Sequence, residues 1–319
     1  MSCEKKESNS DNILLTALVL TLLLYLPTTQ ARQPTLSCGN VAVAQWKSCQ
    51  NETREEFWDQ VARCINESGE SSFYLCLGEV YAEKREAIEL CGEQYSARID
   101  ICDELDDQLY APDVNPDNFL TAAEIAANPN PYFPLTPGLV RIYEAGDETI
   151  TVTVTDEVKE IAGIEAIVVR DTVEEEGEFV EDTDDWFAQD KDGNVWYLGE
   201  LSKNFEEGEL VDLDGSWKTG VDSARPGIIM FANPEVGTVY RQEYSIGEAE
   251  DMAEIFDIAE TSEMVPVADC SATCVVTREF LPFEPDVEEF KYYAPGIGLI
   301  LAIDGETGDR EELVEVIQP

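Results

Sequence analysis

The fold is decided by residues 38–102, which read CGNVAVAQWKSCQNETREEFWDQVARCINESGESSFYLCLGEVYAEKREAIELCGEQYSARIDIC. The six cysteines are separated by 11, 15, 12, 15 and 11 residues, so their spacing is a palindrome. The two residue numbers add up to 140 in each of three pairs: the first and last cysteines, the second and fifth, and the third and fourth. At about 100° per residue, steps of 11 and 15 residues return to within about 20° and 60° of one direction on an α-helix. Two antiparallel helices would therefore place the two trios of cysteines level with each other.

The residues between the cysteines favour the same structure. Apolar residues recur at steps of three and four between Val43 and Cys64 and again between Phe73 and Leu105, which is the helical period. The connection 66–72 has turn chemistry, with Gly69 as a helix stop. We predict a disulfide-stapled α-hairpin within residues 32–110. Its disulfides would be Cys38–Cys102, Cys49–Cys91 and Cys64–Cys76.

Cysteine usage and the N-terminus indicate export. Residues 1–31 are typical of a secretion signal, with Lys5 and Lys6 before an apolar run at 13–26 and a small-residue site at 29–31. The run is too short to span a bilayer upright, and a tilted membrane anchor is the alternative. Eight cysteines remain after its removal, and an even number suits an oxidising compartment. We expect a secreted, periplasmic or cell-surface protein in which Cys270–Cys274 forms a fourth disulfide.

Composition excludes much familiar chemistry. The chain has 319 residues, 68 Asp and Glu, 20 Lys and Arg, and no histidine, which gives a formal charge of −48. Nucleic acid is excluded as a partner, and anionic lipid is disfavoured, because both are bound through Lys and Arg. Without histidine there is no Ser-His-Asp triad and no His-ligated metal site. Any catalysis would rest on carboxylates, lysine, tyrosine or a cofactor, and the sequence leans against an enzyme.

One loop matches the EF-hand calcium pattern. Position 6 is Asn118 where glycine is usual, and Pro116 at position 4 lacks a backbone N–H. The alternative is a capped helix start that opens the segment 119–127, within a linker that we place at residues 111–133. The predicted calcium ligands are Asp113, Asn115, Asp117, the carbonyl of Phe119, Thr121 and Glu124.

Residues 134–319 show the pattern of an antiparallel β domain. Ile150–Thr155 alternates strictly, and Asp-Gly and Gly-Asp pairs separate further short apolar segments. We expect about nine strands in a curled sheet, either an open barrel or sandwich-like. Residues 248–258 could form a helix or a strand, and we favour a strand. The predicted fold class is therefore α+β: a stapled antiparallel α-hairpin followed by a curled antiparallel β-sheet.

Four phrases in this half resemble a family of secreted bacterial β-domains of uncharacterised function. The resemblance covers about residues 112–317 and excludes the cysteine-rich hairpin. The resemblance implies a secreted β fold and does not imply any activity. The phrases are NPYFPLTPG at 130–138, DTDDWFAQDKDGNVWY at 182–197, YRQEY and GEAED within 240–251, and KYYAPGIG at 291–298.

These observations favour an exported, non-enzymatic acidic protein with a structural or interaction role at or outside the cell surface. It would bind divalent cations such as calcium, or an unknown protein or surface partner. Two alternatives stay open: a carboxylate-dependent hydrolase, and a carbohydrate-binding protein that stacks sugars on Trp186, Trp196, Tyr197 and Trp217. The acidic stretches 181–185 and 190–194 also suggest a metal, although Asp-Gly-Asn is ordinary hairpin-turn chemistry. Dense surface acid is moreover an adaptation to high salt, so the charge alone names no ligand.

Overall fold

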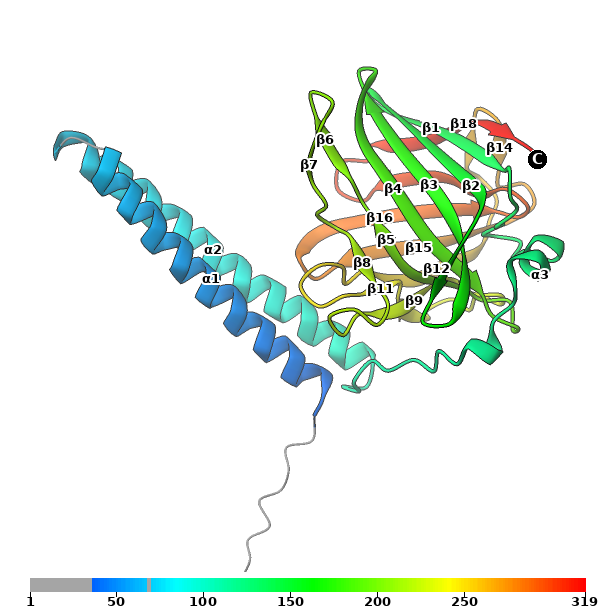
Figure 1. The fold of residues 1–319 in the computed structure, drawn as a ribbon, viewed down its shortest axis with the longest axis horizontal. Helices are drawn as coiled ribbons and strands as arrows, with labels where there is room; N and C mark the ends of the chain where they lie inside the picture. The colour runs from blue at the N-terminus through cyan, green and yellow to red at the C-terminus, as the bar shows by residue number, and fades with distance from the viewer. Residues whose placement is uncertain (1–35, 68–69) are drawn as a thin grey trace, which may run out of the picture. The chain divides into compact units, whose positions relative to one another are not determined.

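The computed structural model describes residues 36–67 and 70–319, which form one compact unit from Leu36 onward. The predicted secretion signal and the predicted hairpin turn at Gly69 lie outside the described residues. Figure 1 shows a long helical hairpin followed by a large curled sheet. The fold class is α+β, as the sequence predicts. No helix of the described part is long and apolar enough to cross a membrane.

The hairpin consists of α1 (Cys38–Glu67) and α2 (Glu70–Glu104). Its disulfides join Cys38 to Cys102, Cys49 to Cys91 and Cys64 to Cys76, which are the pairs that the palindromic spacing predicts. The middle of the hairpin buries little, since its apolar cluster has only Phe57, Cys64 and Val80 as fully buried members. Three covalent links therefore hold two helices that have a small core of their own.

The connection to the sheet contains a 3-10 turn, η1 (Pro116–Asn118), and the short helix α3 (Ala122–Ala127). Phe119 packs against the outer face of the sheet with Ile164, Val168 and Trp186. This contact explains why residues 164–169 are almost continuously apolar: part of the strand is covered on both faces.

The sheet has 16 strands and a nearly closed barrel form, with a separate two-stranded ribbon of β13 and β14. Its path runs β10-β12-β15-β16-β17-β18-β1-β2-β3-β4-β5-β9-β11. In chain order the strands are β1 (Val140–Ala145), β2 (Glu148–Ile161), β3 (Ile164–Glu175), β4 (Glu178–Gln189), β5 (Val195–Leu201), β6 (Asn204–Glu206), β7 (Glu209–Asp212), β8 (Trp217–Lys218), β9 (Arg225–Met230), β10 (Val239–Arg241), β11 (Glu243–Tyr244), β12 (Met252–Glu260), β13 (Met264–Val265), β14 (Ala268–Asp269), β15 (Cys274–Leu281), β16 (Glu284–Ala294), β17 (Gly298–Asp304) and β18 (Arg310–Ile317).

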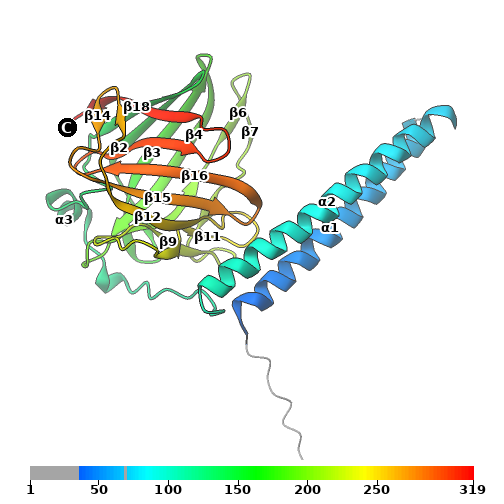
Figure 2. The same cartoon turned by 180° about the vertical axis from the view of Figure 1, so that it is seen from behind.

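The two ends of this path are consecutive in the chain, because only Gln242 separates β10 from β11. One half of the segment 239–244 pairs with β12 and the other half with β9, which brings the sheet almost to closure. Gly227 on β9 makes this approach feasible, since a Cβ there would lie 2.1 Å from the Gln242 carbonyl oxygen. Strands β2, β3 and β4 face the viewer in Figure 1, and β12, β15 and β16 face the viewer in Figure 2.

The prediction of about nine strands was wrong in number. Strand β2 has 14 residues where the sequence suggested six. The structure also has strands that the sequence patterns did not indicate, namely β1, β4, β6, β7, β8, β9, β13, β14 and β18. Strand β4 was hidden because its inward positions carry acids as well as apolar residues, which removes the alternation that marks a half-buried strand. The choice of strand for 248–258 is confirmed by β12.

Candidate functional site

The predicted calcium loop has the geometry of two helix caps. The Asn115 side chain accepts the backbone N–H of Asp117 at 3.1 Å. The Glu124 carboxylate accepts the backbone N–H of Thr121 at 2.8 Å and its hydroxyl at 2.7 Å, forming a capping box at the start of α3. These hydrogen bonds hold the pKa of Glu124 below its ordinary value. The carboxylate that calcium would use in bidentate fashion is thus engaged with the helix start.

The remaining predicted ligands are spread along the loop. The carbonyl of Asp117 accepts from the Lys191 ammonium group at 2.5 Å, and the Phe119 ring is buried against the sheet. Across residues 36–67 and 70–319, no cluster of three or more Asp, Glu or Cys side chains has an arrangement that could hold a metal ion. Calcium binding at this loop stays a prediction, and the structure shows a capped helix start there.

The aromatic residues suggested as a sugar-stacking surface lie in the interior. Trp186, Tyr197 and Trp217 are at most 5% exposed. Trp196 is half-buried, and its indole N–H donates to Asp190 at 2.9 Å. These rings pack against other side chains, so they provide no open face on which a sugar could stack.

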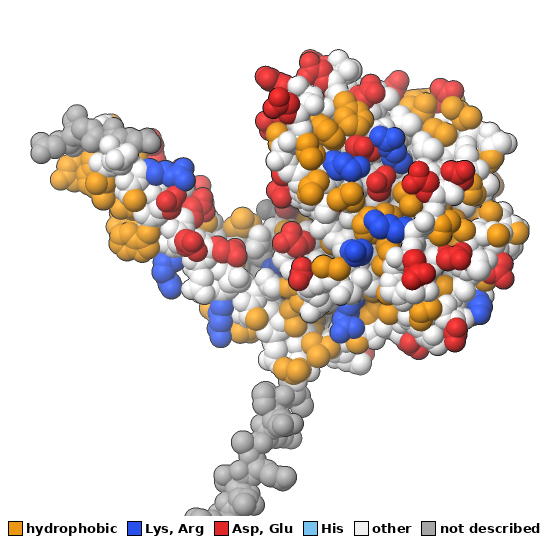
Figure 3. All heavy atoms as spheres, viewed as in Figure 1, with side chains coloured by type: hydrophobic (Ala, Val, Ile, Leu, Met, Phe, Trp, Pro, Cys, Tyr) orange, Lys and Arg blue, Asp and Glu red, His pale blue; other side chains and the backbone are white. Residues whose placement is uncertain are grey.

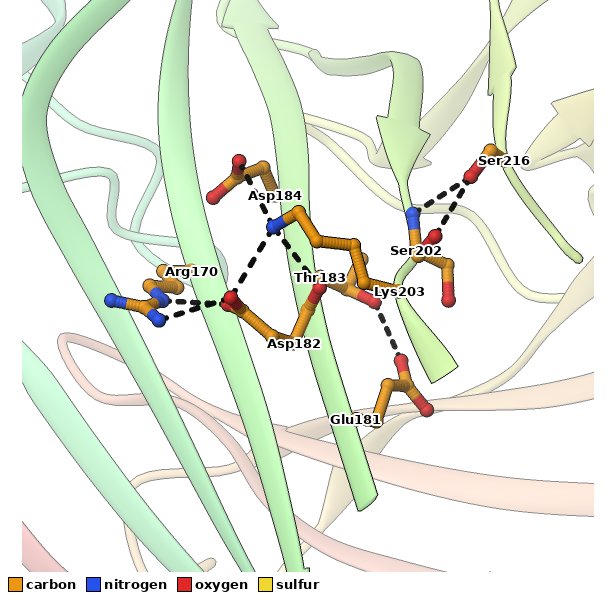
Figure 4. A network of polar contacts seen from close by, with 8 residues as sticks. All are labelled: Arg170, Glu181, Asp182, Thr183, Asp184, Ser202, Lys203 and Ser216. Carbon is orange, nitrogen blue, oxygen red and sulfur yellow. Dashed lines mark hydrogen bonds and ion pairs between the residues drawn. The ribbon is translucent and has the colours of Figure 1, made fainter. Parts of the chain in front are cut away.

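The acidic stretch 181–185 is divided by the pleat of β4. Asp182 lies on the outer face, where Arg170 donates to both of its carboxylate oxygens at 2.7 and 3.0 Å. Figure 4 shows Lys203 between Asp182 and Asp184, at 3.3 and 3.7 Å from their carboxylates. Glu181 instead accepts from the Thr183 hydroxyl at 2.6 Å. The stretch is therefore no single metal cluster, because its outward acids are neutralised by cations of the neighbouring strands.

The inward acids of several strands meet inside the barrel, in a region that we call the acidic lumen. Its mouth is a cavity of about 640 Å³ between the β1–β2 turn and strands β16, β17 and β18. The only cation in its lining, Arg310, already pairs with Glu263 and Glu312. The seven carboxylates that line the mouth are Asp147, Glu148, Glu175, Glu289, Asp304, Asp309 and Glu311.

Deeper in the barrel, Asp185 and Glu200 are direct neighbours across β4 and β5. The Tyr197 hydroxyl contacts both of them and lies 2.5 Å from Asp185. One hydroxyl carries one proton, so this set of contacts needs a further proton on a carboxyl group. Like charges directly opposite on neighbouring strands repel, which favours that proton. Tyr197, Asp185 and Glu200 form what we call the inner cluster.

Burial and mutual repulsion raise the pKa values of the lumen acids. Burial first, and then the charges of nearby acids, raise the pKa of Asp171, Glu200 and Glu311 each to about 7. The same causes raise the pKa of Asp251 to about 6 and that of Asp185 well above its ordinary value. Near neutral pH these groups exchange protons readily, as buried functional carboxyl groups do.

The lumen contains too few cations to balance its acids. Lys291 lies 2.8 Å from Glu279 and 3.1 Å from Glu289, so its charge is shared by two carboxylates. Asp171 has one carboxylate oxygen that is buried and lacks a hydrogen-bond partner, although the side chain faces the same interior as Glu311. A buried acceptor without a partner is costly, and a ligand that donates hydrogen bonds would relieve it.

Sequence reasoning did not find this site. Asp171, Glu200 and Glu311 come from β3, β5 and β18, and no local motif connects them. The only signal was the acid within otherwise apolar strands, such as Asp171 after the run 164–169. With 68 acids in the chain, that signal occurs in many places.

The four disulfides of the described residues place the protein in an oxidising compartment, secreted, periplasmic or at the cell surface. Cys270 and Cys274 form the fourth, across the start of β15.

Comparison with known proteins leaves the family open. No family model and no curated protein matches the chain. Among solved structures it is similar to a protein described as exported, with a YmcC-like fold, from Bacteroides fragilis: the TM-score is 0.35 and identity 14%, over 59% of this chain and 100% of that one. It is also similar to a protein described as a lipoprotein from Parabacteroides distasonis, with TM-score 0.31 and 13% identity, over 59% of this chain and 99% of that one. TM-scores this low carry no argument about fold or function.

Proposed function

We propose that this exported protein is a binding protein, and that its acidic lumen takes a small organic cation with more than one ammonium group. The observation that carries the proposal is the mouth cavity of about 640 Å³, lined by seven carboxylates and by one arginine that is already paired. Cavities of roughly 300–1,000 Å³ are of the size that binds small molecules.

The distribution of the acids favours an organic cation over a metal ion. A metal needs several oxygens within about 2.5 Å of one point, and the described residues contain no such group. The lumen carboxylates are spread over several strands, which suits a ligand whose positive charges are separated by a carbon chain. Glu311 lines the mouth cavity and offers an acceptor for an ammonium group, and the neighbouring Asp171 has a buried oxygen without a hydrogen-bond partner.

Binding is to be measured by titration calorimetry with spermidine, using residues 32–319, at pH 7 in two buffers of different ionisation enthalpy. An ammonium group beside Glu311 or Asp171 lowers the raised pKa of that carboxyl group, so binding should release protons into the buffer. The double variant Glu175→Gln/Glu311→Gln should weaken binding about tenfold or more, which is about 1.4 kcal/mol. The control Glu315→Gln, on the exposed side of β18, removes one charge outside the lumen and should bind normally.

Two results would contradict the proposal. One is an equal loss of affinity in Glu315→Gln and in the lumen variant, because binding would then follow general charge. The other is turnover of an ester or glycan that Glu200→Gln abolishes, which would establish the carboxylate-dependent hydrolase instead.

A further inference from the structure

The helical hairpin exposes a set of large apolar side chains. Trp58, Ile65, Tyr74, Tyr81 and Ile88 are between 45% and 76% exposed. We call these five residues the aromatic face. Exposed groups of this kind mark interaction surfaces when they are contiguous, whereas scattered ones are ordinary.

These residues lie on one side of the hairpin. Trp58 and Ile65 are seven residues apart on α1, and Tyr74, Tyr81 and Ile88 repeat at seven residues on α2, so each set follows one side of its helix. The Phe57 ring connects the two helices, with its centroid 5.1 Å from that of Trp58 and 5.2 Å from that of Tyr81. The disulfide Cys64–Cys76 holds the two helices together beside Ile65. The aromatic face is therefore continuous across both helices.

The charges of the hairpin are sorted by side. Arg54 precedes Trp58 by one helical turn, and Arg85 follows Tyr81 by one turn, so both border the aromatic face. Six further acids repeat at steps of four and three on the other side, about 100–160° from Trp58 or Tyr81 around each helix at about 100° per residue. They are Glu52, Glu56 and Asp59 on α1, and Glu79, Glu83 and Glu86 on α2.

Two observations support this division. Glu56 and Glu83 line one shallow pocket together, so the two acidic rows lie on the same side of the hairpin. Figure 3 shows hydrophobic and basic side chains along one long edge of the hairpin, and acidic side chains with a basic one near the tip along the other. The aromatic face is not free of acids, because Glu55 precedes Trp58 by three residues, but in a chain of formal charge −48 a face bordered by two arginines is an exception.

The hairpin cannot hide this face by rearrangement. The Cys49–Cys91 and Cys64–Cys76 disulfides prevent the helices from separating or rotating to bury the rings. The aromatic face is thus permanently presented to the surroundings.

We propose that the aromatic face binds a lipid surface that carries anionic headgroups. Trp and Tyr place an apolar ring and a polar edge at the boundary between headgroups and acyl chains, and flanking Arg and Lys attract anionic lipid. A second copy of the chain would bind this face less well. A two-fold contact would bring the Arg54 and Arg85 side chains of both copies together, where their positive charges repel.

The negative total charge of the chain does not prevent the aromatic face from approaching an anionic membrane. Charges are screened over about 8–10 Å at 0.1–0.15 M salt, and α1 with 30 residues is about 45 Å long at about 1.5 Å per residue. The distal half of the hairpin therefore meets a membrane with its own local charges, of which Arg54 and Arg85 border the aromatic face and most acids lie on the other side. The expectation that anionic lipid is disfavoured concerns the molecule as a whole, whereas this proposal concerns the aromatic face alone.

The test is co-flotation of residues 32–319 with phosphatidylcholine vesicles, with and without phosphatidylglycerol. This form lacks the apolar run 13–26, which would bind lipid by itself, and it contains the compact unit from Leu36 onward. The chain should float with the anionic vesicles and show a blue shift of tryptophan fluorescence as Trp58 enters the bilayer surface.

The variants separate apolar from ionic contributions. Trp58→Ser/Tyr81→Ser should lower vesicle binding about tenfold or more, and Arg54→Gln/Arg85→Gln should lower it for anionic vesicles only. Glu56→Gln/Glu83→Gln changes two charges on the opposite side and should retain binding.

Absence of flotation overturns the proposal, and so does equal loss of vesicle binding in all three variants. Dimerisation by light scattering that only Trp58→Ser/Tyr81→Ser abolishes would assign the face to a second copy instead. Unchanged helical content by circular dichroism checks that these exposed substitutions leave the fold intact.

Discussion

Tyr197 shows how a single residue stabilises an arrangement that the sequence would disfavour. Asp185 and Glu200 lie opposite each other across two strands, where two charges would repel. The Tyr197 hydroxyl contacts both groups, and its hydrogen bonds lower the pKa of each against the larger effect of burial. The stability of this inner cluster depends on a shared proton and on one buried hydroxyl group.

Replacing Tyr197 by Phe should therefore raise the pKa of Glu200 above about 7, because the carboxylate loses its donor. The free energy of unfolding should fall by about 1–3 kcal/mol, the usual cost of a buried acceptor left without its partner. Urea unfolding at pH 8 and pH 5 measures the effect, and the loss should be smaller at pH 5, where the carboxyl groups are protonated. An equal loss at both values would show that packing alone is responsible.

Thr121 distinguishes the two interpretations of the loop 113–124. Thr121→Ala removes the cap of α3 and should lower the free energy of unfolding by about 1 kcal/mol, equally in calcium and in chelator. Thermal melting at matched ionic strength measures this. A calcium-dependent rise in Tm that Asp113→Ala abolishes would instead establish the predicted metal site, and would require Glu124 to leave Thr121.

At the scale of elements, the hairpin depends on covalent links and the sheet on its core. The double variant Cys49→Ser/Cys91→Ser removes a disulfide between two residues that are 42 positions apart in the sequence. This loss should destabilise the hairpin by about 3–4 kcal/mol. Amide hydrogen exchange should speed up in α1 and α2 while β2, β3 and β4 keep their protection. Equal acceleration in the sheet would show that hairpin and sheet unfold together.

A buried ion pair connects these two elements. Arg98 on α2 donates to both carboxylate oxygens of Glu250 at 3.2 and 3.0 Å, and both side chains are less than a tenth exposed. Removing one partner leaves a buried charge, so Arg98→Ala should cost about 3–5 kcal/mol. The exposed pair Arg63–Asp59 is the matched control, and Arg63→Ala should cost less than about 1 kcal/mol. Urea unfolding compares the two, and similar losses would contradict the importance of burial.

For the whole molecule, the raised pKa values in the lumen predict that stability falls as pH rises. Carboxyl groups titrate near 4 in the unfolded chain, whereas Asp171, Glu200 and Glu311 titrate at about 7 in the folded one. The folded state therefore binds more protons between these values, and the stability from this source is complete below about pH 4 and lost above about pH 7.

Between pH 8 and pH 5, Tm should therefore rise as pH is lowered. Glu311→Gln should flatten part of the slope, and Glu315→Gln on the exposed side should leave it unchanged. A Tm that falls steadily over the same interval would contradict the raised pKa values.

The formal charge of −48 predicts a second dependence at this scale. Self-repulsion weakens as salt screens it, so the free energy of unfolding should rise from low to high sodium chloride. A melting series in sodium chloride and in an equal ionic strength of spermidine separates general screening from binding in the lumen. Equal gains in both salts would leave the charge explained by salt adaptation alone.

The sequence by itself determined the hairpin. Its cysteines and apolar residues follow the period of a helix, so the direction of every side chain is known within one element, and the palindrome then specifies which cysteines meet. It also indicated an antiparallel sheet after residue 134, from alternation and turn residues. These are local signals, and local geometry is enough to interpret them.

Only the tertiary structure determined which acids meet in the acidic lumen. Alternation shows which face of a strand is buried when one face is apolar, but the inward positions of Asp171, Asp185 and Glu311 are acidic, so the pattern does not separate inside from outside. These groups meet because β18 pairs with β1 and because the ends of the sheet join at residues 239–244. The closure of a sheet depends on twist and packing summed over all its strands, and no single stretch of sequence contains that information.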